Sequence, residues 1–284
     1  MSKIEFSINS VDSLTLYGNI WEPEGDPKAV ICLVHGLGEH IGRYHYLAEA
    51  MNSARYAVLA ADLRGHGRSA GSRGHTPQYE DLLSDVGLMI EEAQNRFPKL
   101  PLFLYGHSLG GNIVLNYCLR EESQIDGAVT TAPSIKLGFD PPAVKIFLGN
   151  LMNTIWPTFT QASGLETAAL SRDPQVVERY INDPLVHDRV SARLFVGFYQ
   201  AGLWALQHAN ELRLPTLIMQ GSADRLVSCS SAQEFADQAG SICDLKIWPD
   251  FYHEIHNEPE KDLVIEYAVN WLDHHLGEAN NYRI

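Results

Sequence analysis

The chain has 284 residues, of which 45% are hydrophobic and 20% charged, with a formal net charge of −14 at pH 7. A chain of this size can bury a large core, either as one α/β domain with an insertion or as two small domains. Because an excess of negative charge repels phosphate backbones, we expect no nucleic-acid partner.

The sequence also predicts a reduced, cytoplasmic protein. Its first residues, MSKIEFSINSVDSL, lack the basic start and apolar core of a secretory signal. No stretch approaches the ~20 apolar residues of a membrane span. The four cysteines show no CxxC spacing, and Cys32 and Cys118 lie in apolar patterns where buried thiols are common. We therefore expect no disulfides.

An antiparallel hairpin is the first predicted element, from residues 3–9 and 14–23. After it, short apolar runs alternate with helical patterns such as 79–97, whose apolar residues recur along one face. The apolar runs predict buried strands at 29–36, 57–65, 102–108, 127–133, 215–222 and 244–249. Their apolar residues are continuous rather than alternating, which indicates a parallel sheet covered on both faces. The β–α alternation predicts a doubly wound α/β fold.

The alternation breaks between residues 136 and 205. This region shows no clean strand and contains five prolines, Pro141, Pro142, Pro157, Pro174 and Pro184. Apolar residues at helical spacing predict helices over 142–156 and 189–206. We expect a helical insertion over 136–205 that lies over the sheet as a cap, between core segments 1–135 and 206–284.

The pentapeptide GHSLG, residues 106–110, matches the G-x-S-x-G pattern. In that pattern the serine occupies a strained turn from a strand into a helix, and the glycines avoid clashes on either side. The context agrees, because an apolar strand run precedes Ser108 and a helical pattern follows it. A serine hydroxyl is a poor nucleophile until a base removes its proton, so the rest of the chain has to supply that base.

Two later strand ends supply the remaining groups in the required order, Ser, Asp, His. Asp224 and His253 each come just past the end of a predicted strand. Polar groups at the carboxyl ends of parallel strands collect at one edge of the sheet. His253 is the expected base, and Asp224 is the group that orients it. Asp250 and His256 are rivals for these two roles.

An oxyanion intermediate needs N–H donors, and the loss of one donor costs roughly 3 kcal/mol. We expect the first donor from the backbone of Leu109, directly after the predicted nucleophile. The second is expected from Leu37 in HGLGEH, where Gly36 and Gly38 allow close backbone approach. No zinc, P-loop or GxGxxG motif occurs, so we expect neither a metal nor a cofactor.

Together these motifs resemble those of monoacylglycerol lipases, and of the bacterial proteins labelled lysophospholipases, within the α/β-hydrolase fold. The similarity is carried by HGLGEHIGRYHYLA (35–48), DLRGHGRSAGSRGH (62–75), GHSLGG (106–111), DPLVH (183–187), GSADRLV (221–227) and YHEIHNE (252–258). It implies an α/β-hydrolase fold, with a mostly parallel central sheet flanked by helices and a helical cap.

The resemblance also implies that Glu39, Arg43 and His256 hold a glycerol head group. Glycerol in such an ester offers two hydroxyls that a carboxylate and an imidazole can bind. A site built for hydroxyls discriminates against substrates that lack them. Two alternatives stay open: Arg43 only orients Glu39, or Glu39 caps the next helix while Arg43 is solvated.

The cap is implied to supply an apolar channel for one acyl chain, with candidates Ile135, Leu137, Ile146, Leu148, Leu151, Phe159 and Leu203. The expected partner is a small-molecule lipid ester. We also expect the outer edge of the cap to touch membranes or micelles transiently, which would place the protein at the periphery of a membrane. The oligomeric state is left open.

The expected reaction is cleavage of a monoacylglycerol to glycerol and a free fatty acid through an acyl-enzyme. A lysophospholipase and a broad-specificity carboxylesterase are alternatives with the same chemistry. A hydrolase-fold protein that binds without catalysis is an alternative of another class. The intact set of Ser108, Asp224 and His253 favours an enzyme.

Overall fold

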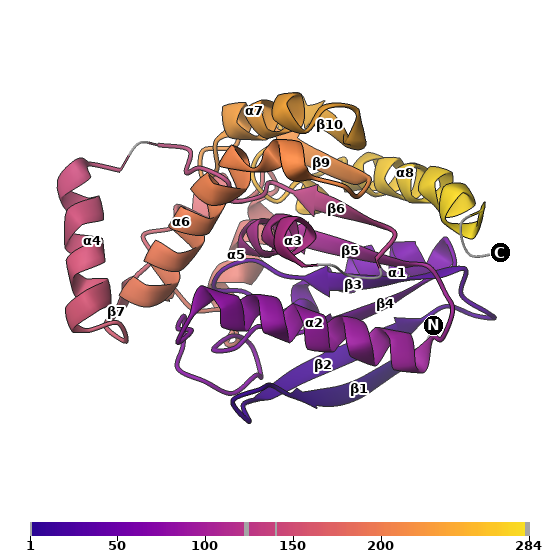
Figure 1. Ribbon diagram of the computed structural model, residues 1–284, viewed down its shortest axis with the longest axis horizontal. Helices are drawn as coiled ribbons and strands as arrows, with labels where there is room; N and C mark the ends of the chain where they lie inside the picture. Colours follow the sequence, from indigo (N-terminus) through magenta and orange to yellow (C-terminus); the bar gives the residue numbers. More distant parts are fainter. Residues whose placement is uncertain (1, 122–124, 140, 282–284) are drawn as a thin grey trace.

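The computed structural model describes residues 2–121, 125–139 and 141–281, and an eight-stranded sheet forms its centre (Figure 1). In order across the sheet, the strands are β1 (Ser2–Asn9), β2 (Thr15–Glu22), β4 (Tyr56–Ala61), β3 (Ala29–Val34), β5 (Leu102–His107), β6 (Gly127–Thr131), β9 (Thr216–Gly221) and β10 (Cys243–Trp248). The pairs β1–β2 and β2–β4 are antiparallel, and the other neighbours are parallel. The predicted mostly parallel sheet is confirmed.

The six predicted buried strands begin within one residue of the observed strands but end too late. The prediction for β4 extends to residue 65, whereas the strand ends at Ala61. Every residue of β3, β4, β5 and β9 is buried, and so are residues 62–65 beyond β4. Burial therefore continues beyond the strand end and does not mark the point at which a strand gives way to the loops that carry the site.

Helices cover both faces of the sheet. They are α1 (His45–Ser53), α2 (Tyr79–Arg96), α3 (Leu109–Arg120), α7 (Cys229–Ala239) and α8 (Lys261–Asn281). Helices α1 and α8 pack on the face that holds Ile31 and Leu33, and α2, α3 and α7 pack on the opposite face with Val30 and Cys32. Successive residues of β3 thus enter different apolar clusters, which explains its continuous apolar run.

The segment between β6 and β9 leaves the sheet and forms a further set of elements (Figure 1). These are α4 (Ala143–Ile155), β7 (Thr160–Ala162), α5 (Pro174–Asn182), β8 (Arg189–Ser191) and α6 (Ala192–Gln207). The expectation of no strand here is wrong, because β7 and β8 pair as a small antiparallel sheet. Strands of three residues are too short to show a readable alternation.

Helix α6 crosses the expected cap boundary at residue 205 and packs into the core. Its residues Ala201 and Ala205 are buried in the cluster that includes α3. Asn116 of α3 also donates a hydrogen bond to the Ala201 carbonyl oxygen at 3.2 Å. One helix therefore serves both parts, and the division into 1–135, 136–205 and 206–284 stays a prediction.

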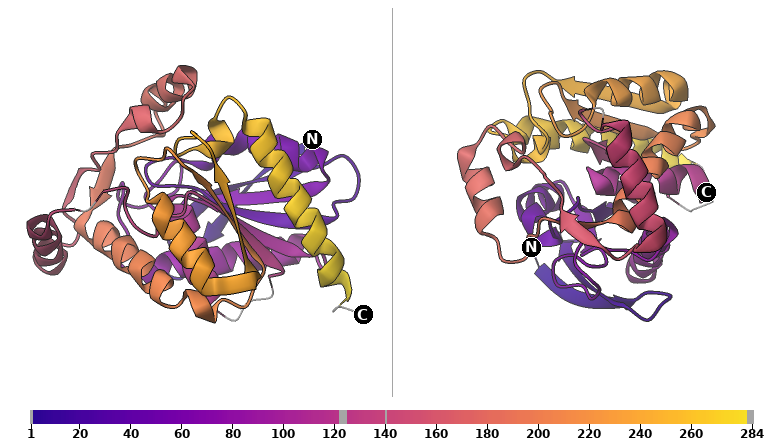
Figure 2. Two further views of the ribbon diagram at one scale, coloured as in Figure 1. Left: turned by 90° about the horizontal axis from the view of Figure 1, so that it is seen from above. Right: turned by 90° about the vertical axis from the view of Figure 1, so that its left-hand side faces the viewer.

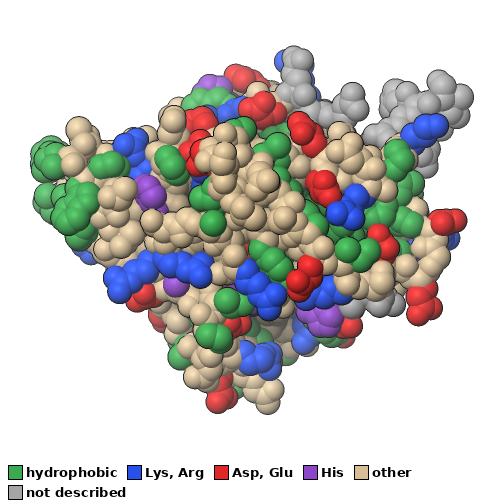
Figure 3. All heavy atoms as spheres, turned by 90° about the horizontal axis from the view of Figure 1, so that it is seen from below, with side chains coloured by type: hydrophobic (Ala, Val, Ile, Leu, Met, Phe, Trp, Pro, Cys, Tyr) green, Lys and Arg blue, Asp and Glu red, His purple; other side chains and the backbone are tan. Residues whose placement is uncertain are grey.

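Helix α4 extends outward from the rest of the molecule and packs against α6 (Figures 1 and 2). The structure describes every residue of α4, and none of them is buried. Its exposed large apolar side chains are Val144, Phe147, Leu148, Leu151 and Ile155. Figure 3 shows hydrophobic side chains gathered at the left edge, the end at which Figure 1 places α4. Within the described residues, no helix has both the length and the apolar character needed to cross a bilayer.

Candidate active site

Ser108 lies at the turn from β5 into α3, as predicted. Its backbone angles, φ 54° and ψ −115°, form a conformation that costs a residue with a side chain about 1–3 kcal/mol. A Cβ atom at Gly106 would lie 2.5 Å from the Gly110 carbonyl oxygen, and one at Gly110 would overlap the carbonyl oxygen of Val34. The two glycines therefore make this turn possible.

The structure brings Ser108, His253 and Asp224 together from three strand ends. His253 Nε2 lies 2.9 Å from Ser108 Oγ, and His253 Nδ1 lies 2.7 Å from Asp224 Oδ2. Asp250 is exposed, and both ring nitrogens of His256 lack a partner among the described residues. Neither rival takes part in this chain of hydrogen bonds.

Asp224 is held as a buried acceptor. It accepts from the Leu226 and Val227 amides at 2.8 and 3.1 Å, and from the Gln220 side chain at 2.8 Å. Burial alone would raise the pKa of Asp224, but the His253 ring and the amides outweigh burial and leave the pKa below its usual value. Burial would lower the pKa of His253, yet the Asp224 carboxylate raises it above 6.5. Asp224 thus favours the Nδ1–H tautomer, which leaves Nε2 to accept the serine proton.

Two backbone amides beside Ser108 are available to bind an oxyanion. Neither the Leu37 N–H nor the Leu109 N–H has an acceptor in the part of the chain that the structure describes. A Cβ atom at Gly36 would lie 3.3 Å from Ser108 Cβ, so the loop that carries Leu37 passes directly by the nucleophile. Both expected donors therefore lie next to Ser108, and their role as an oxyanion hole stays a prediction.

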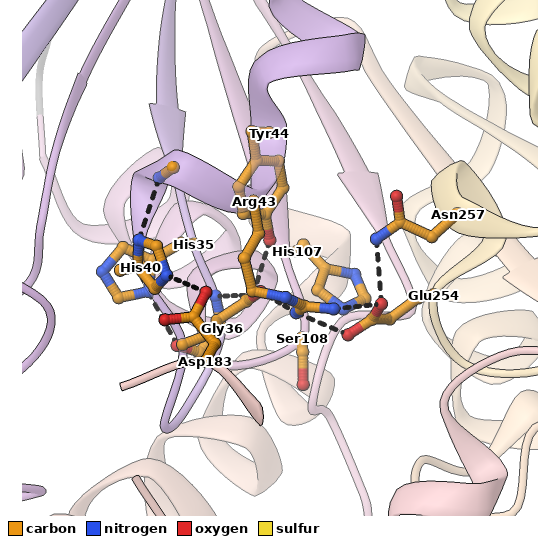
Figure 4. Close-up of polar contacts among 12 residues, drawn as sticks. His35, Gly36, His40, Arg43, Tyr44, His107, Ser108, Asp183, Glu254 and Asn257 are labelled. Atoms are coloured by element: carbon orange, nitrogen blue, oxygen red, sulfur yellow. Dashed lines mark hydrogen bonds and ion pairs between the residues drawn. The ribbon is translucent and has the colours of Figure 1, made fainter. Parts of the chain in front are cut away.

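Arg43 pairs with two buried carboxylates, those of Glu39 and Glu254. Figure 4 shows the Arg43 side chain pointing toward Glu254. Its terminal nitrogens donate to the two oxygens of Glu254, both at 2.7 Å, and Nη1 also donates to Glu39. Glu39 accepts in addition from the Gly36 amide and the Tyr44 hydroxyl, both at 2.6 Å. Burial alone would raise the pKa of each carboxyl, but Arg43 together with the other polar neighbours outweighs burial and holds both pKa values below their usual range. One cation between two anions leaves one net negative charge.

Only one of the three residues expected to hold a head group lines the cavity beside Ser108. Glu39 lines this cavity, whereas Arg43 and His256 are not among the described residues that line it. His256 is buried against the rings of Tyr44 and His107, at centroid distances of 5.1 and 4.6 Å. Burial lowers the pKa of His256 to about 4, so its ring is neutral at pH 7.

The cavity has a volume of about 150 Å³ and is partly open to solvent. Near Ser108 its wall carries Glu39, Glu254 and Tyr180, and among the described residues no Lys or Arg lines it. Much of the remaining wall is apolar and includes Leu137, Phe139, Leu165, Leu170, Phe195 and Phe198. The described part of the chain holds no group of three or more His, Cys, Asp or Glu side chains arranged for a metal ion. The cavity suits a molecule with a polar head and an apolar chain.

The expected channel residues mostly lie elsewhere. Leu137 lines the cavity as predicted. The remaining candidates do not: Ile135, Ile146, Leu148, Leu151, Phe159 and Leu203. The prediction assumed that apolar residues of the insertion face inward, but α4 extends outward from the rest of the molecule with no buried residue, and Ile135 belongs to the core. The wall is formed instead by the loops around α5 and by α6.

Sequence reasoning missed two side chains of the site, Glu254 and Tyr180. Glu254 lies between His253 and Ile255, which is buried. A buried carboxylate needs a cation as partner, so the apolar neighbour of Glu254 was a usable signal. Tyr180 belongs to α5, which was not predicted. The start of α5 is marked by Asp173, which accepts from the backbone as an N-cap and is followed by a proline.

The fold and the groups at its carboxyl edge define a hydrolase of the α/β-hydrolase fold, with a serine on a strand-to-helix turn beside an Asp–His pair. A family model described as "Serine aminopeptidase, S33" matches residues 25–260, and this chain belongs to that family. The resemblance inferred from the motifs and the predicted fold are both confirmed.

Known relatives and solved structures agree with this assignment. The chain is 33% identical to a monoacylglycerol lipase of Mycolicibacterium smegmatis, over 97% of this chain and 99% of that protein. It is also 33% identical, over 95% of its length, to an uncharacterized abhydrolase domain-containing protein of Dictyostelium discoideum, of which it spans 29%. The crystal structure of a Paleococcus ferrophilus monoacylglycerol lipase superposes with a TM-score of 0.84 and 34% identity, covering 92% of this chain and 99% of that one.

Proposed function

We propose that this chain hydrolyses monoacylglycerols to glycerol and a free fatty acid through an acyl-enzyme at Ser108. The observation that carries the proposal is the composition of the cavity wall, with the carboxylates of Glu39 and Glu254 near Ser108 and apolar side chains beyond them. A monoacylglycerol has the matching division into a hydroxyl-bearing head and one apolar chain. The similarity to monoacylglycerol lipases supports the same conclusion.

In the proposed reaction, Ser108 Oγ attacks the ester carbonyl while His253 Nε2 takes its proton. Asp224 stabilises the imidazolium that forms, and the amides of Leu37 and Leu109 bind the oxyanion. His253 returns the proton to the leaving glycerol oxygen, which leaves the acyl group on Ser108. Water then attacks the acyl-enzyme, again with His253 as base, and the fatty acid is released.

For the head group, we propose that the glycerol hydroxyls donate to Glu39 and Glu254. A hydrogen bond to a charged acceptor contributes about 1.5–3 kcal/mol. The negative charge of these carboxylates, together with the absence of Lys and Arg among the described lining residues, disfavours an anionic phosphate head. A glycerol ester is therefore favoured over a lysophospholipid. In this proposal Arg43 and His256 support the head-group site from behind its wall.

For the lipid, we propose that residues 136–205 form a cap over the acyl chain and that α4 contacts membranes or micelles. Between residues 141 and 165 the sequence has one charged residue, Lys145, although the whole chain carries a net charge of −14. An exposed apolar surface with a single positive charge suits a lipid interface. The protein would then act at the periphery of a membrane.

Substrates that lack one or both hydroxyls test the head-group proposal. We would compare esters of glycerol, 1,3-propanediol and 1-propanol with one acyl chain, and add lysophosphatidylcholine and leucine p-nitroanilide, the latter as an aminopeptidase substrate. We expect kcat/KM to fall about 10- to 100-fold for each hydroxyl removed. Equal rates on the propyl and glycerol esters would overturn the head-group proposal. Preferred cleavage of lysophosphatidylcholine or of the anilide would assign a different substrate class.

A further inference from the structure

One side chain joins the two loops that carry the proposed oxyanion hole and the proposed base. We call residues 36–39 the oxyanion loop and residues 252–257 the histidine loop. Arg43 reaches the first loop through Glu39. It reaches the second loop through Glu254 (Figure 4). The two loops are remote in sequence, and a single guanidinium connects them.

We infer that Arg43 is a positioning residue, which holds the oxyanion loop and the histidine loop in fixed relation by pairing with Glu39 and Glu254 at once. The inference rests on the proposed hydrolase function but not on the identity of the ester. Arg43 does not line the cavity, its side chain is 10% exposed, and the Tyr180 ring covers its guanidinium at 4.7 Å. Arg43 is thus placed to act on the two loops rather than on a substrate.

On the oxyanion side, the contacts run from Arg43 to the peptide beside Leu37. Glu39 accepts from Arg43 on Oε2, and on Oε1 it accepts from the Gly36 amide at 2.6 Å. The Tyr44 hydroxyl donates to the same Oε1 at 2.6 Å. Because Gly36 directly precedes Leu37, a displaced Glu39 would release the peptide that presents the Leu37 N–H. Groups of this kind work only when they are held within about 0.5 Å of the productive position.

On the other side, the contacts fix the residue next to His253. Both oxygens of Glu254 accept from Arg43 at 2.7 Å, and such a fork sets orientation as well as distance. Asn257 donates to Glu254 Oε2 at 2.8 Å, and the Glu254 amide donates to the Leu170 carbonyl at 2.7 Å. A displaced Glu254 would therefore move His253 relative to the nucleophile.

The charges explain why an arginine is needed. Without Arg43, the buried carboxylates of Glu39 and Glu254 would face each other without a cation between them. Carboxylates that share a site cannot both stay ionised, so one would take up a proton or move. A lysine would restore the charge but lacks the planar fork that spans both partners.

The variants Arg43→Met and Arg43→Lys test the inference on p-nitrophenyl butyrate, which contains no glycerol, and on a monoacylglycerol. Because a misplacement of about 1 Å can cost about 100-fold in rate, we expect Arg43→Met to lower kcat about 10- to 100-fold on both substrates. KM on p-nitrophenyl butyrate should change by less than about threefold, as expected for an effect on the transition state. Arg43→Lys should recover part of the loss. Glu254→Gln, which weakens the fork, should lower kcat several-fold on both esters.

Arg64→Met is the matched control. Arg64 is also a buried arginine, and it forms a fork with Asp85 at 2.7 and 2.9 Å on the α2 side of the sheet. Its replacement should lower the Tm and leave kcat on p-nitrophenyl butyrate unchanged at a temperature well below that Tm. A loss of kcat equal to that of Arg43→Met would assign the effect to general destabilisation and overturn the inference.

Other outcomes also decide. Loss of kcat on the monoacylglycerol alone would place Arg43 in head-group binding and overturn its positioning role. Unchanged kcat in Arg43→Lys would show that the fork is not required, with the same consequence. If Arg43→Met does not fold, Glu254→Gln decides, and its unchanged kcat on p-nitrophenyl butyrate would overturn the inference. The proposed function has its own test: if the unaltered protein cleaved p-nitrophenyl butyrate but no monoacylglycerol, the proposed function would fail and the inference about Arg43 would not.

Discussion

The insertion between β6 and β9 has two parts that relate differently to the rest of the molecule. Residues 167–191, which we call the docked part, bond to the loops of the site, whereas α4, the arm, has no buried residue. The carbonyl oxygens of Ala169 and Leu170 accept from the amides of His253 and Glu254, at 3.3 and 2.7 Å. The docked part therefore fixes the backbone of the histidine loop.

The docked part also meets the oxyanion loop. The His187 amide donates to the Gly38 carbonyl oxygen at 2.9 Å. Directly after the loop, the His40 ring lies 2.9 Å from the Asp183 carboxylate. Both loops that frame Ser108 are thus tied to one stretch of the insertion. We call Ser108, Asp224, the two loops and the docked part the framework of the site. The arm is left free to contact other surfaces.

The largest effect is expected inside the framework, at Asp224. Asp224→Asn keeps the shape of the side chain but lets it donate, so that His253 adopts the tautomer that cannot accept the Ser108 proton. We expect kcat on p-nitrophenyl butyrate to fall about 10⁴-fold. Asp250→Asn is the control, since Asp250 lies exposed in the same region, and it should leave kcat unchanged. A larger loss in Asp250→Asn would assign the orienting role to Asp250.

The second-largest effect on kcat is expected where the docked part meets the oxyanion loop. Gly38 has φ 78°, and a Cβ atom there would overlap the carbonyl oxygen of His187. Gly38→Ala should displace the loop, lower kcat about 10- to 100-fold and lower the Tm.

Gly25→Ala separates backbone strain from displacement of the loop. Gly25 has φ 80°, but its Cβ atom would meet none of the described atoms within 4 Å. This variant should show only the backbone cost, about 1–2 kcal/mol of stability, with kcat unchanged. If both variants kept full kcat, the contact between His187 and Gly38 would not position the oxyanion loop.

Within the framework, the three groups at the strand ends were the most predictable part. Ser108, Asp224 and His253 could be placed together because each follows a continuous apolar run, and parallel strands end at one edge of a sheet. The hydrogen-bond chain that joins them agrees with that reasoning. The short strands β7 and β8 escaped it, because three residues carry too little pattern.

Pairings between distant loops could not be predicted. The bond between Arg43 and Glu254 joins residues 211 positions apart, and little beyond its apolar neighbour distinguishes Glu254 from an exposed carboxylate. The outward lean of α4 escaped prediction for a related reason. An apolar stripe on a helix fits a buried face and a lipid-facing surface equally well.

The pH dependence gives a smaller and graded effect within the framework. A proton on Nε2 of His253 removes the base, and although burial opposes it, the Asp224 carboxylate raises the pKa of His253 above 6.5. As the pH falls below that pKa, kcat/KM on p-nitrophenyl butyrate should fall about tenfold per pH unit. The groups that face His253 are Asp224, Ser108, His107, Glu39, Glu254 and His256. A midpoint well below 6.5 in the pH profile would contradict the charged Asp224 partner.

The smallest effect is expected on the arm. Phe147 is 66% exposed, and Phe147→Ser removes its apolar surface without touching the framework. If the arm contacts lipid, partial burial of this ring contributes about 1 kcal/mol, so binding to vesicles should weaken roughly fivefold. Sedimentation with phosphatidylcholine vesicles measures the binding. Hydrolysis of a monoacylglycerol presented in the vesicles should fall in parallel, and kcat on p-nitrophenyl butyrate should not change.

Leu263→Ser is the control for the arm, because Leu263 is a 55% exposed apolar residue on α8. It should bind vesicles as strongly as the unaltered protein. Equal binding by Phe147→Ser and Leu263→Ser would contradict lipid contact through α4. Loss of kcat on p-nitrophenyl butyrate in Phe147→Ser would have a different meaning, since the arm would then support the site, and the distinction between a docked part and a free arm would disappear.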